Sequence, residues 1–390
     1  MLACEKVPLG ASMGRTVRED VVSGSAFPAC DLSAMDGYSV AASDVAGASG
    51  ANPVRLRMVG TVRAGEAPRG RIERGECYEI MTGAALPEGA DTVVPQEAVK
   101  VEDGSISIGA PCTAGDFVRR RGGVLAAGEK IALEGRRASP QVLALLDAIG
   151  VSEVSVTKRP RVAVIATGDE LASGEAPPDR FHIRPSNLTM LAALVSAAGC
   201  VVGEARRSRD SERQLAERFD ACARCDAVVV SGGVAGGKFD LVKSALGRAG
   251  AAIRFEDVLM SPGKRTVFAT KGDTSFFCLP GNPFAALVSF QAIALPGIST
   301  LLGLKDPLPR TFCMRLAASI DAGRAEDGWT RFVPGRITGT MEVEPIKMRA
   351  TGDIVSLAET TCLIRLDPDR PPASAGDFVS IWTVPEGVAS

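Results

Sequence analysis

Three uniformly apolar runs, each followed by a Gly-rich turn, form the clearest pattern of hydrophobic and polar positions along the chain. They cover residues 161–167, 226–230 and 276–279. Apolar runs bounded by glycine are typical of strands buried on both faces of a parallel sheet, and ligands bind such sheets at the carboxyl ends of the strands. Three strand ends therefore predict one composite polar pocket. Its backbone N–H groups suit an anionic, phosphate-bearing ligand.

Helical patterns alternate with these strands between residues 158 and 305. One helix should open at Asp210 and Ser211, with Gln214 three residues beyond Ser211 as in a capping box. The alternation implies a parallel sheet covered by helices. The other elements expected here are helices at 188–198 and 240–248 and one from Pro283 onward, with strands at 200–205 and near 253–259.

The segments on either side have a different pattern. The first 157 residues hold short apolar stretches and one clear helix, with Ser139 as N-cap, Pro140 at its first position and Gly150 as its stop. The rest of this part should form small β domains. After a linker at 305–309, a short β barrel or sandwich is expected, with apolar runs at 311–316, 342–346, 362–366 and 378–384.

Composition narrows the class of protein. A chain of 390 residues, 46% of them hydrophobic, should form two to four domains with real cores. A formal net charge of −2 argues against sequence-independent binding of nucleic acid. The chain has no uninterrupted apolar stretch of about 18 residues, and its first residues lack a secretory apolar segment. We therefore expect no membrane association and a cytoplasmic location.

Cysteine and histidine usage limits the available chemistry. Ten cysteines are scattered singly, and most should be reduced and buried. Cys222 and Cys225 form one Cys-x-x-Cys pair, but a zinc site needs two more ligands, and a redox site needs the pair at a helix N-terminus rather than its end. His182 is the one histidine, so catalysis here should use carboxylates, hydroxyls, lysine and a metal.

Two polar segments precede the sheet region. Residues 33–38 place Asp36 before Gly37, which is a turn signal, and residues 81–94 have the pattern of a strand end, a loop and another strand. Together with the Gly turns, they resemble the MoeA family of molybdopterin molybdenumtransferases, to which part of gephyrin is related. The matching segments follow the family's order: 33–38, 82–84, 86–91, 167–171, 186–187, 231–234 and 279–283.

The resemblance implies a multidomain α/β plus β fold and a homodimer. It predicts an N-terminal α+β domain (1–25 with 125–157), a small β-rich domain (26–124), a central parallel-sheet α/β domain that binds molybdopterin (158–305) and a C-terminal β barrel (306–390). Molybdate is inserted into adenylylated molybdopterin with Mg²⁺, and AMP is released. Molybdopterin adenylyltransferase and molybdoenzyme maturation proteins are the protein partners that it implies.

Site residues follow from the same resemblance. Asp36 and Thr82 would reach into the partner subunit's cleft as closing groups. Glu170 and Asp240 would bind the metal, although Asp210 and Asp240 can equally be N-caps of the helices that follow them. The catalytic set is Asp36, Thr82, Glu170, Asp210 and Asp240. The ligand-binding set is Thr167, Gly168, Ser231, Gly232, Gly233, Gly263, Lys264, Pro280, Gly281, Asn282 and Pro283.

The chain departs from the family pattern inside the expected site. Two family carboxylates are replaced by Gly123 and Val124, and a family acid by Lys238. The family's Lys-Pro-Gly-Lys-Pro-Phe run is here Ser261 to Thr266, with Arg265 as a new base. Two functions therefore stay open: a molybdenum insertase, and a MoeA-like binding protein that acts as carrier, scaffold or regulator. Further departures are Pro185, Pro334 and Asp353.

Overall fold

The central sheet of the molecule is a mixed sheet of mostly parallel strands. The computed structural model describes residues 2–172, 179–234, 241–320, 328–368 and 373–385. The strand order is β14-β13-β15-β19-β18-β16, and β14, β13, β15 and β19 pair in parallel. The bounds are β13 Arg161–Thr167, β14 Val201–Ser208, β15 Ala227–Ser231, β16 Ala252–Glu256, β18 Val267–Lys271 and β19 Thr274–Leu279.

The pattern of the sequence did not predict β18, which pairs antiparallel with both of its neighbours. It is joined to β19 through Gly272, whose φ of 55° lies in the left-handed region that glycine adopts readily. A two-residue Gly-Asp turn between short apolar runs is a hairpin signal. The sheet is therefore parallel where the three Gly turns end it and antiparallel toward one edge.

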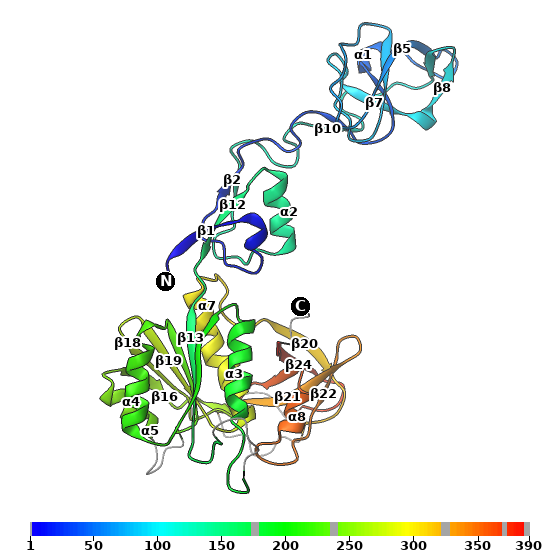
Figure 1. The fold of residues 1–390 in the computed structure, drawn as a ribbon. Coiled ribbons are helices and arrows are strands. Elements are labelled where there is room, and N and C mark those ends of the chain that lie inside the picture. Colours follow the sequence, from blue (N-terminus) through cyan, green and yellow to red (C-terminus); the bar gives the residue numbers. More distant parts are fainter. Residues whose placement is uncertain (1, 173–178, 235–240, 321–327, 369–372, 386–390) are drawn as a thin grey trace.

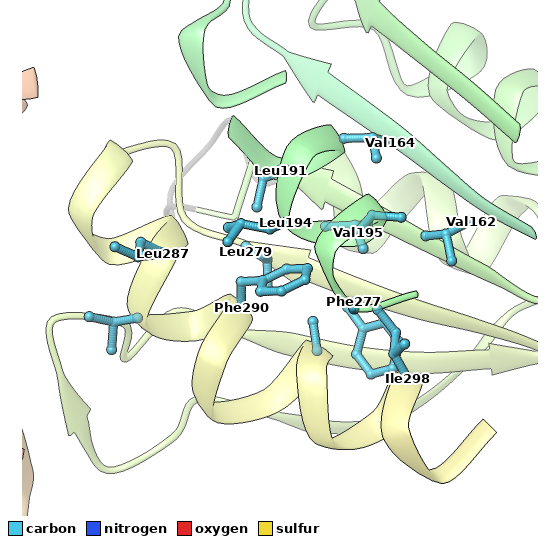
Figure 2. Close-up of a cluster of buried hydrophobic side chains, with 14 of the residues drawn as sticks. Val162, Val164, Leu191, Leu194, Val195, Phe277, Leu279, Leu287, Phe290 and Ile298 are labelled. Atoms are coloured by element: carbon cyan, nitrogen blue, oxygen red, sulfur yellow. The ribbon is translucent and has the colours of Figure 1, made fainter. Parts of the chain in front are cut away.

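Alternation along each buried strand divides the sheet residues between two cores. Val162 and Val164 of β13 face the same core as Phe277 of β19, whereas Ile165 faces the other. Helices α3 (Ser186–Ala197) and α6 (Pro283–Ser289) cover the first face, as Figure 2 shows. Helices α4 (Glu212–Ala221) and α5 (Leu241–Arg248) cover the second. Every residue of β15 is buried, as expected for a central strand with helices on both sides.

Helix ends agree with the predicted capping residues at two places. In α4, Ser211 is the N-cap and its Oγ accepts from the N–H of Gln214 at 3.4 Å. Helix α2 (Pro140–Ala148) begins with Ser139 as N-cap and Pro140 at its first position, as predicted. The caps satisfy N–H groups that the first turn of a helix leaves without partners.

One apolar helical stretch is long enough to cross a membrane by length and composition. It covers Pro283–Leu301, and 61% of its most apolar window is buried inside the molecule. It consists of α6, a π-helical turn at Phe290–Ala294 and α7 (Leu295–Leu301). Phe290 and Ile298 of this stretch pack into the core shown in Figure 2. It therefore acts as a core helix of the central domain.

The C-terminal strands close into a barrel beside the central sheet (Figure 1). The barrel order is β21-β22-β20-β24-β23, and pairing of β23 with β21 closes it. Short strand β17 (Met260–Ser261) also pairs with β21. The bounds are β20 Thr311–Leu316, β21 Thr330–Thr338, β22 Glu342–Pro345, β23 Cys362–Leu366 and β24 Phe378–Thr383, with helix α8 at Ile354–Ala358.

The N-terminal part extends away from the central sheet in Figure 1. One core there surrounds α2 and the pair β1 (Cys4–Pro8) and β12 (Glu153–Thr157). The short strands β2 (Val21–Val22) and β11 (Lys130–Ile131) pair in the same part, and β3 (Leu32–Ser33) pairs with β10 (Val118–Arg119). The domain boundaries themselves stay a prediction.

A third six-stranded sheet forms the far end of the molecule (Figure 1). Its order is β7-β4-β6-β5-β9-β8. The strands are β4 Gly37–Val40, β5 Val54–Val62, β6 Glu76–Ile80, β7 Thr92–Pro95, β8 Val99–Glu102 and β9 Ser105–Ile108, with the short helix α1 at Ala42–Val45.

All ten cysteines are free thiols. Five are buried, two are half-buried and three are exposed, so burial is less general than the sequence predicts. Cys222 follows α4 at its C-terminal end, and burial raises the pKa of its thiol to about 12. The described residues hold no group of three His, Cys, Asp or Glu side chains that could bind a metal. The raised pKa disfavours the reactive thiolate form of Cys222.

Candidate functional site

The three Gly turns meet at one cavity of about 700 Å³ at the carboxyl ends of β13, β15 and β19. This is the arrangement that the sequence predicts. Thirteen polar and glycine residues line it, together with proline and apolar residues. Of the predicted set, the cavity is lined by Thr167, Gly168, Glu170, Asp210, Ser231, Gly232, Gly233, Pro280, Gly281 and Pro283.

Glycine is required at position 232 for the turns to meet. Its φ is 97°, and a Cβ placed on it would lie 2.3 Å from the carbonyl oxygen of Thr167. A Cβ on Gly281 would lie 3.5 Å from the Cα of Gly232. The backbones of neighbouring strand ends therefore approach so closely that a side chain at position 232 would force them apart.

Asn187, near the start of α3, joins two of the turns. Its Nδ2 donates to Ser231 Oγ at 2.9 Å and to the carbonyl oxygen of Gly281 at 2.7 Å. Ser231 Oγ in turn donates to the carbonyl oxygen of Pro280 at 3.2 Å. Asn187 Oδ1 is buried and has no hydrogen-bond partner among the described residues. It is thus a free acceptor at a residue that lines the cavity.

Two carboxylates line the cavity. A Cβ on Gly168 would lie 2.6 Å from each Glu170 carboxylate oxygen, so the glycine leaves room for that side chain to fold over the turn. Asp210 accepts from Thr167 Oγ1 at 2.8 Å, and its own N–H points to Asp169 Oδ1 at 3.2 Å. Asp210 is not a helix N-cap, because Ser211 has that position. Asp240 and Lys238 lie outside the described residues.

Asp36 and Thr82 lie together but do not line this cavity. Both the N–H and the Oγ1 of Thr82 donate to Asp36 Oδ1, at 2.7 and 2.8 Å. These hydrogen bonds hold the pKa of the Asp36 carboxyl below its usual value. The pair belongs to the far β domain, next to β4 and β6, well away from the central sheet of its own chain in Figure 1.

Three predicted ligand-binding residues lie outside the cavity lining. Lys264 Nζ is 4.8 Å from the centroid of the Trp329 ring, a cation–π contact with the segment that precedes β21. Gly263, with a φ of 118°, packs against Met260 and Ser289. Asn282 is the N-cap of α6, where its Oδ1 accepts from the N–H of Ala285 at 3.1 Å.

Several lining residues were absent from the predicted site. Asn187 and Arg184 belong to the polar segment before and at the start of α3, whose Ser-Asn pair was the available signal. Arg265 lines the cavity and pairs with Asp257 at 3.1 Å. Gly352 and Ile354 come from the barrel domain, and no local pattern indicates that they should reach the central sheet.

His182, the one histidine of the chain, is exposed, and its Nδ1 lies 2.8 Å from Asp179 Oδ1 in a hydrogen bond.

Three sequence families match the chain in order. The MoeA N-terminal region (domain I and II) matches residues 1–150, a probable molybdopterin binding domain matches 163–300, and the MoeA C-terminal region (domain IV) matches 321–384. The middle match contains β15, β19, all of β13 except its first two residues, and all three Gly turns. The cavity therefore lies mostly in the part of the chain that resembles molybdopterin-binding domains, and the barrel domain adds Gly352 and Ile354 to its lining.

Curated relatives match over nearly the whole length. Molybdopterin molybdenumtransferase 2 of Mycobacterium tuberculosis is 35% identical over 390 residues, covering 98% of this chain and 96% of that protein. Molybdopterin molybdenumtransferase of Bacillus subtilis is 31% identical, covering 98% of this chain and 90% of that protein. A molybdopterin biosynthesis MoeA structure from Pyrococcus horikoshii superposes with a TM-score of 0.79 at 28% identity, covering 98% and 94% of the two chains. On its sequence, its domain order and its fold, this chain belongs to the MoeA family.

Proposed function

We propose that this protein inserts molybdate into adenylylated molybdopterin and releases AMP. The observation that carries the proposal is the meeting of three Gly turns and two carboxylates at one cavity within the molybdopterin-binding domain. Curated relatives of full length are named molybdopterin molybdenumtransferases, which supports the same reaction for this chain.

The chain's own groups match the parts of such a substrate. The N–H groups of Gly168 and Gly232 already donate to the carbonyl oxygens of Ser208, at 3.4 Å, and of Leu279, at 3.0 Å. The other backbone N–H groups of these two turns, together with the start of α6, would bind phosphate oxygens. Asn187 Oδ1, buried and without a partner in the described chain, would accept from an N–H of the pterin ring. The Thr167–Asp210 hydrogen bond fixes one carboxylate, so that Glu170 is the more adaptable of the two.

The donor set fits a Mg²⁺ ion that is shared with the substrate. Magnesium is commonly held by one or two carboxylates plus substrate phosphates. Glu170 and Asp210 would supply these carboxylates, with Asp240 as a further predicted ligand outside the described residues. When bound, the ion would neutralise charge on the phosphate that is cleaved. The described residues hold no group of three His, Cys, Asp or Glu side chains that could bind a metal, so the proposed ion would need ligands from the substrate.

The resemblance supports further proposals about assembly. A homodimer would bring Asp36 and Thr82 of one subunit to the cavity of the other, since the β domain next to whose strands β4 and β6 they lie is far from the central sheet in their own chain. We also retain a cytoplasmic location, with molybdopterin adenylyltransferase as the source of substrate and molybdoenzyme maturation proteins as acceptors of product.

The proposal is tested by incubating the purified protein with molybdate, Mg²⁺ and adenylylated molybdopterin. Formation of the molybdenum-containing cofactor supports the insertase. Tight binding of adenylylated molybdopterin without product would favour the alternative, a carrier, scaffold or regulator. One observation favours that alternative: Lys264 contacts Trp329 rather than the cavity, and no lysine is among the described lining residues.

A further inference from the structure

A second cavity, of about 650 Å³, adjoins the first and is rich in arginine. The two cavities share Arg184, Pro185 and Ser186. The second one lies beyond the carboxyl end of the edge strand β14, between the first turn of α3 and helix α4. Its volume is within the range of small-molecule sites. Its arginines are Arg184, Arg207, Arg209 and Arg218.

The positive charges of Arg207, Arg209 and Arg218 in this second cavity are poorly balanced among the described residues. None of its described lining residues is a carboxylate. Arg218 has one acidic partner outside the lining, Glu204, at 3.6 Å. Glu204 also pairs with Arg206 at 2.9 Å, so its charge is shared. Gathering guanidinium groups without matching carboxylates is unfavourable unless an anion offsets the charge.

Arg207 adds a specific unmet hydrogen bond. Its Nε is buried and has no acceptor within the part of the chain that the structure describes. A buried donor without an acceptor destabilises the protein, because the group has lost its hydrogen bonds to water. The N-cap residue of the neighbouring helix α3 is Pro185, which makes no side-chain capping hydrogen bond. Both features favour an acceptor of negative charge.

We propose that this arginine cavity is a second binding site for a tetrahedral oxyanion. The planar fork of arginine matches the geometry of phosphate-like oxygens and can bind two of them at once. The inference rests on the proposed function for the identity of the ligand, since that reaction has two tetrahedral oxyanions: molybdate as substrate and the phosphate of AMP as product. The site's position beside the main cavity places either one next to the reaction.

The test measures binding of three probes separately by calorimetric titration: molybdate, inorganic phosphate and AMP. Arg209→Gln is the main variant, because the hydrogen bonds of Arg209 given by the structure use its backbone carbonyl oxygen and not its side chain. Arg207→Gln removes the buried donor. Arg213→Gln is the matched control, since Arg213 is exposed, pairs with Glu217 at 2.8 Å and does not line the cavity.

Arg209→Gln and Arg207→Gln should each bind at least one probe about tenfold more weakly than the wild type, because each loses a charge-assisted hydrogen bond. The control Arg213→Gln should bind all three probes with wild-type affinity. The difference should shrink as salt rises. Weaker binding of molybdate alone would identify molybdate as the ligand of this site. Weaker binding of both AMP and phosphate would identify the nucleotide as the ligand. Wild-type affinity in Arg209→Gln for all three probes, or no binding by the wild type, would overturn the site. Insertion activity is measured in a separate assay, so failure of the arginine site can be distinguished from failure of the proposed insertase function.

Discussion

Glu170 is the residue on which the chemistry of the main cavity depends most. Its carboxylate lies against the Gly168 turn, and no basic partner for it is described. Glu170→Gln keeps the shape and removes the charge. We expect insertion to fall by about 10²–10⁴-fold, the usual range for a catalytic carboxylate, with an unchanged melting temperature. Glu359→Gln, at an exposed residue that follows α8, is the control. Unchanged turnover in Glu170→Gln would remove this residue from the mechanism.

A substitution at Gly232 tests whether the close approach of the turns requires glycine at this position. Gly232→Ala places a Cβ against the Thr167 carbonyl oxygen at a φ of 97°. The free energy of unfolding should therefore fall by about 1–3 kcal/mol. Gly247→Ala is the matched control. Gly247 lies in α5, and a Cβ added to it would meet nothing within 4 Å. Gly247→Ala should therefore raise the free energy of unfolding by about 0.5–1 kcal/mol. Equal denaturant midpoints for the two variants would contradict the close-approach account.

At the scale of elements, helix α8 of the barrel domain contributes Ile354 to the lining of the main cavity. Its N-terminus is capped by Asp353. Asp353 accepts from the N–H groups of Val355 and Ser356, and its hydrogen bond from Ser356 Oγ is 2.6 Å long. The hydrogen bonds from Ser356 Oγ and from the backbone N–H groups of Arg349 and Ser356 lower the pKa of the Asp353 carboxyl to about 2, from its usual 3.8. A lowered folded-state pKa gives stability that is complete above the unfolded value and is lost as the pH falls toward 2.

We therefore expect Asp353→Ala to lower the melting temperature at pH 7, with a smaller difference from wild type at pH 3. Asp353→Asn keeps an acceptor oxygen but cannot titrate, so it should lose less stability at pH 7. Thermal unfolding at pH 7, 5, 4 and 3 measures both effects. A deficit in Asp353→Ala that is constant over this range would show that the charge of the carboxylate contributes nothing.

Local sequence patterns predicted the elements that carry the site but not every element around them. Strands β13 and β20 begin and end at the predicted residues, because their apolar runs are bounded by clear breaks. Strand β21 was missed, since Pro334 and Gly335 in its middle weaken a strand pattern. The wall from Gly352 and Ile354 depends on packing of the barrel against the central domain, which no local pattern records.

At the scale of the whole molecule, the position of Asp36 and Thr82 is the feature that needs a second subunit. They form one hydrogen-bonded pair in the far β domain (Figure 1). A mixture of Asp36→Ala and Glu170→Ala chains should form heterodimers with one intact site and recover up to about half of the wild-type activity per dimer. Confirmed heterodimers without activity would place the complete site within one subunit.

The central claim is that this cavity carries out metal insertion coupled to cleavage of the adenylate. The most direct measurement counts, in one reaction of the purified protein, the molybdenum bound to pterin and the AMP released. The account predicts that both rise together in equal amounts and that both stop when molybdate is omitted. Stable binding of adenylylated molybdopterin with neither product formed would contradict it.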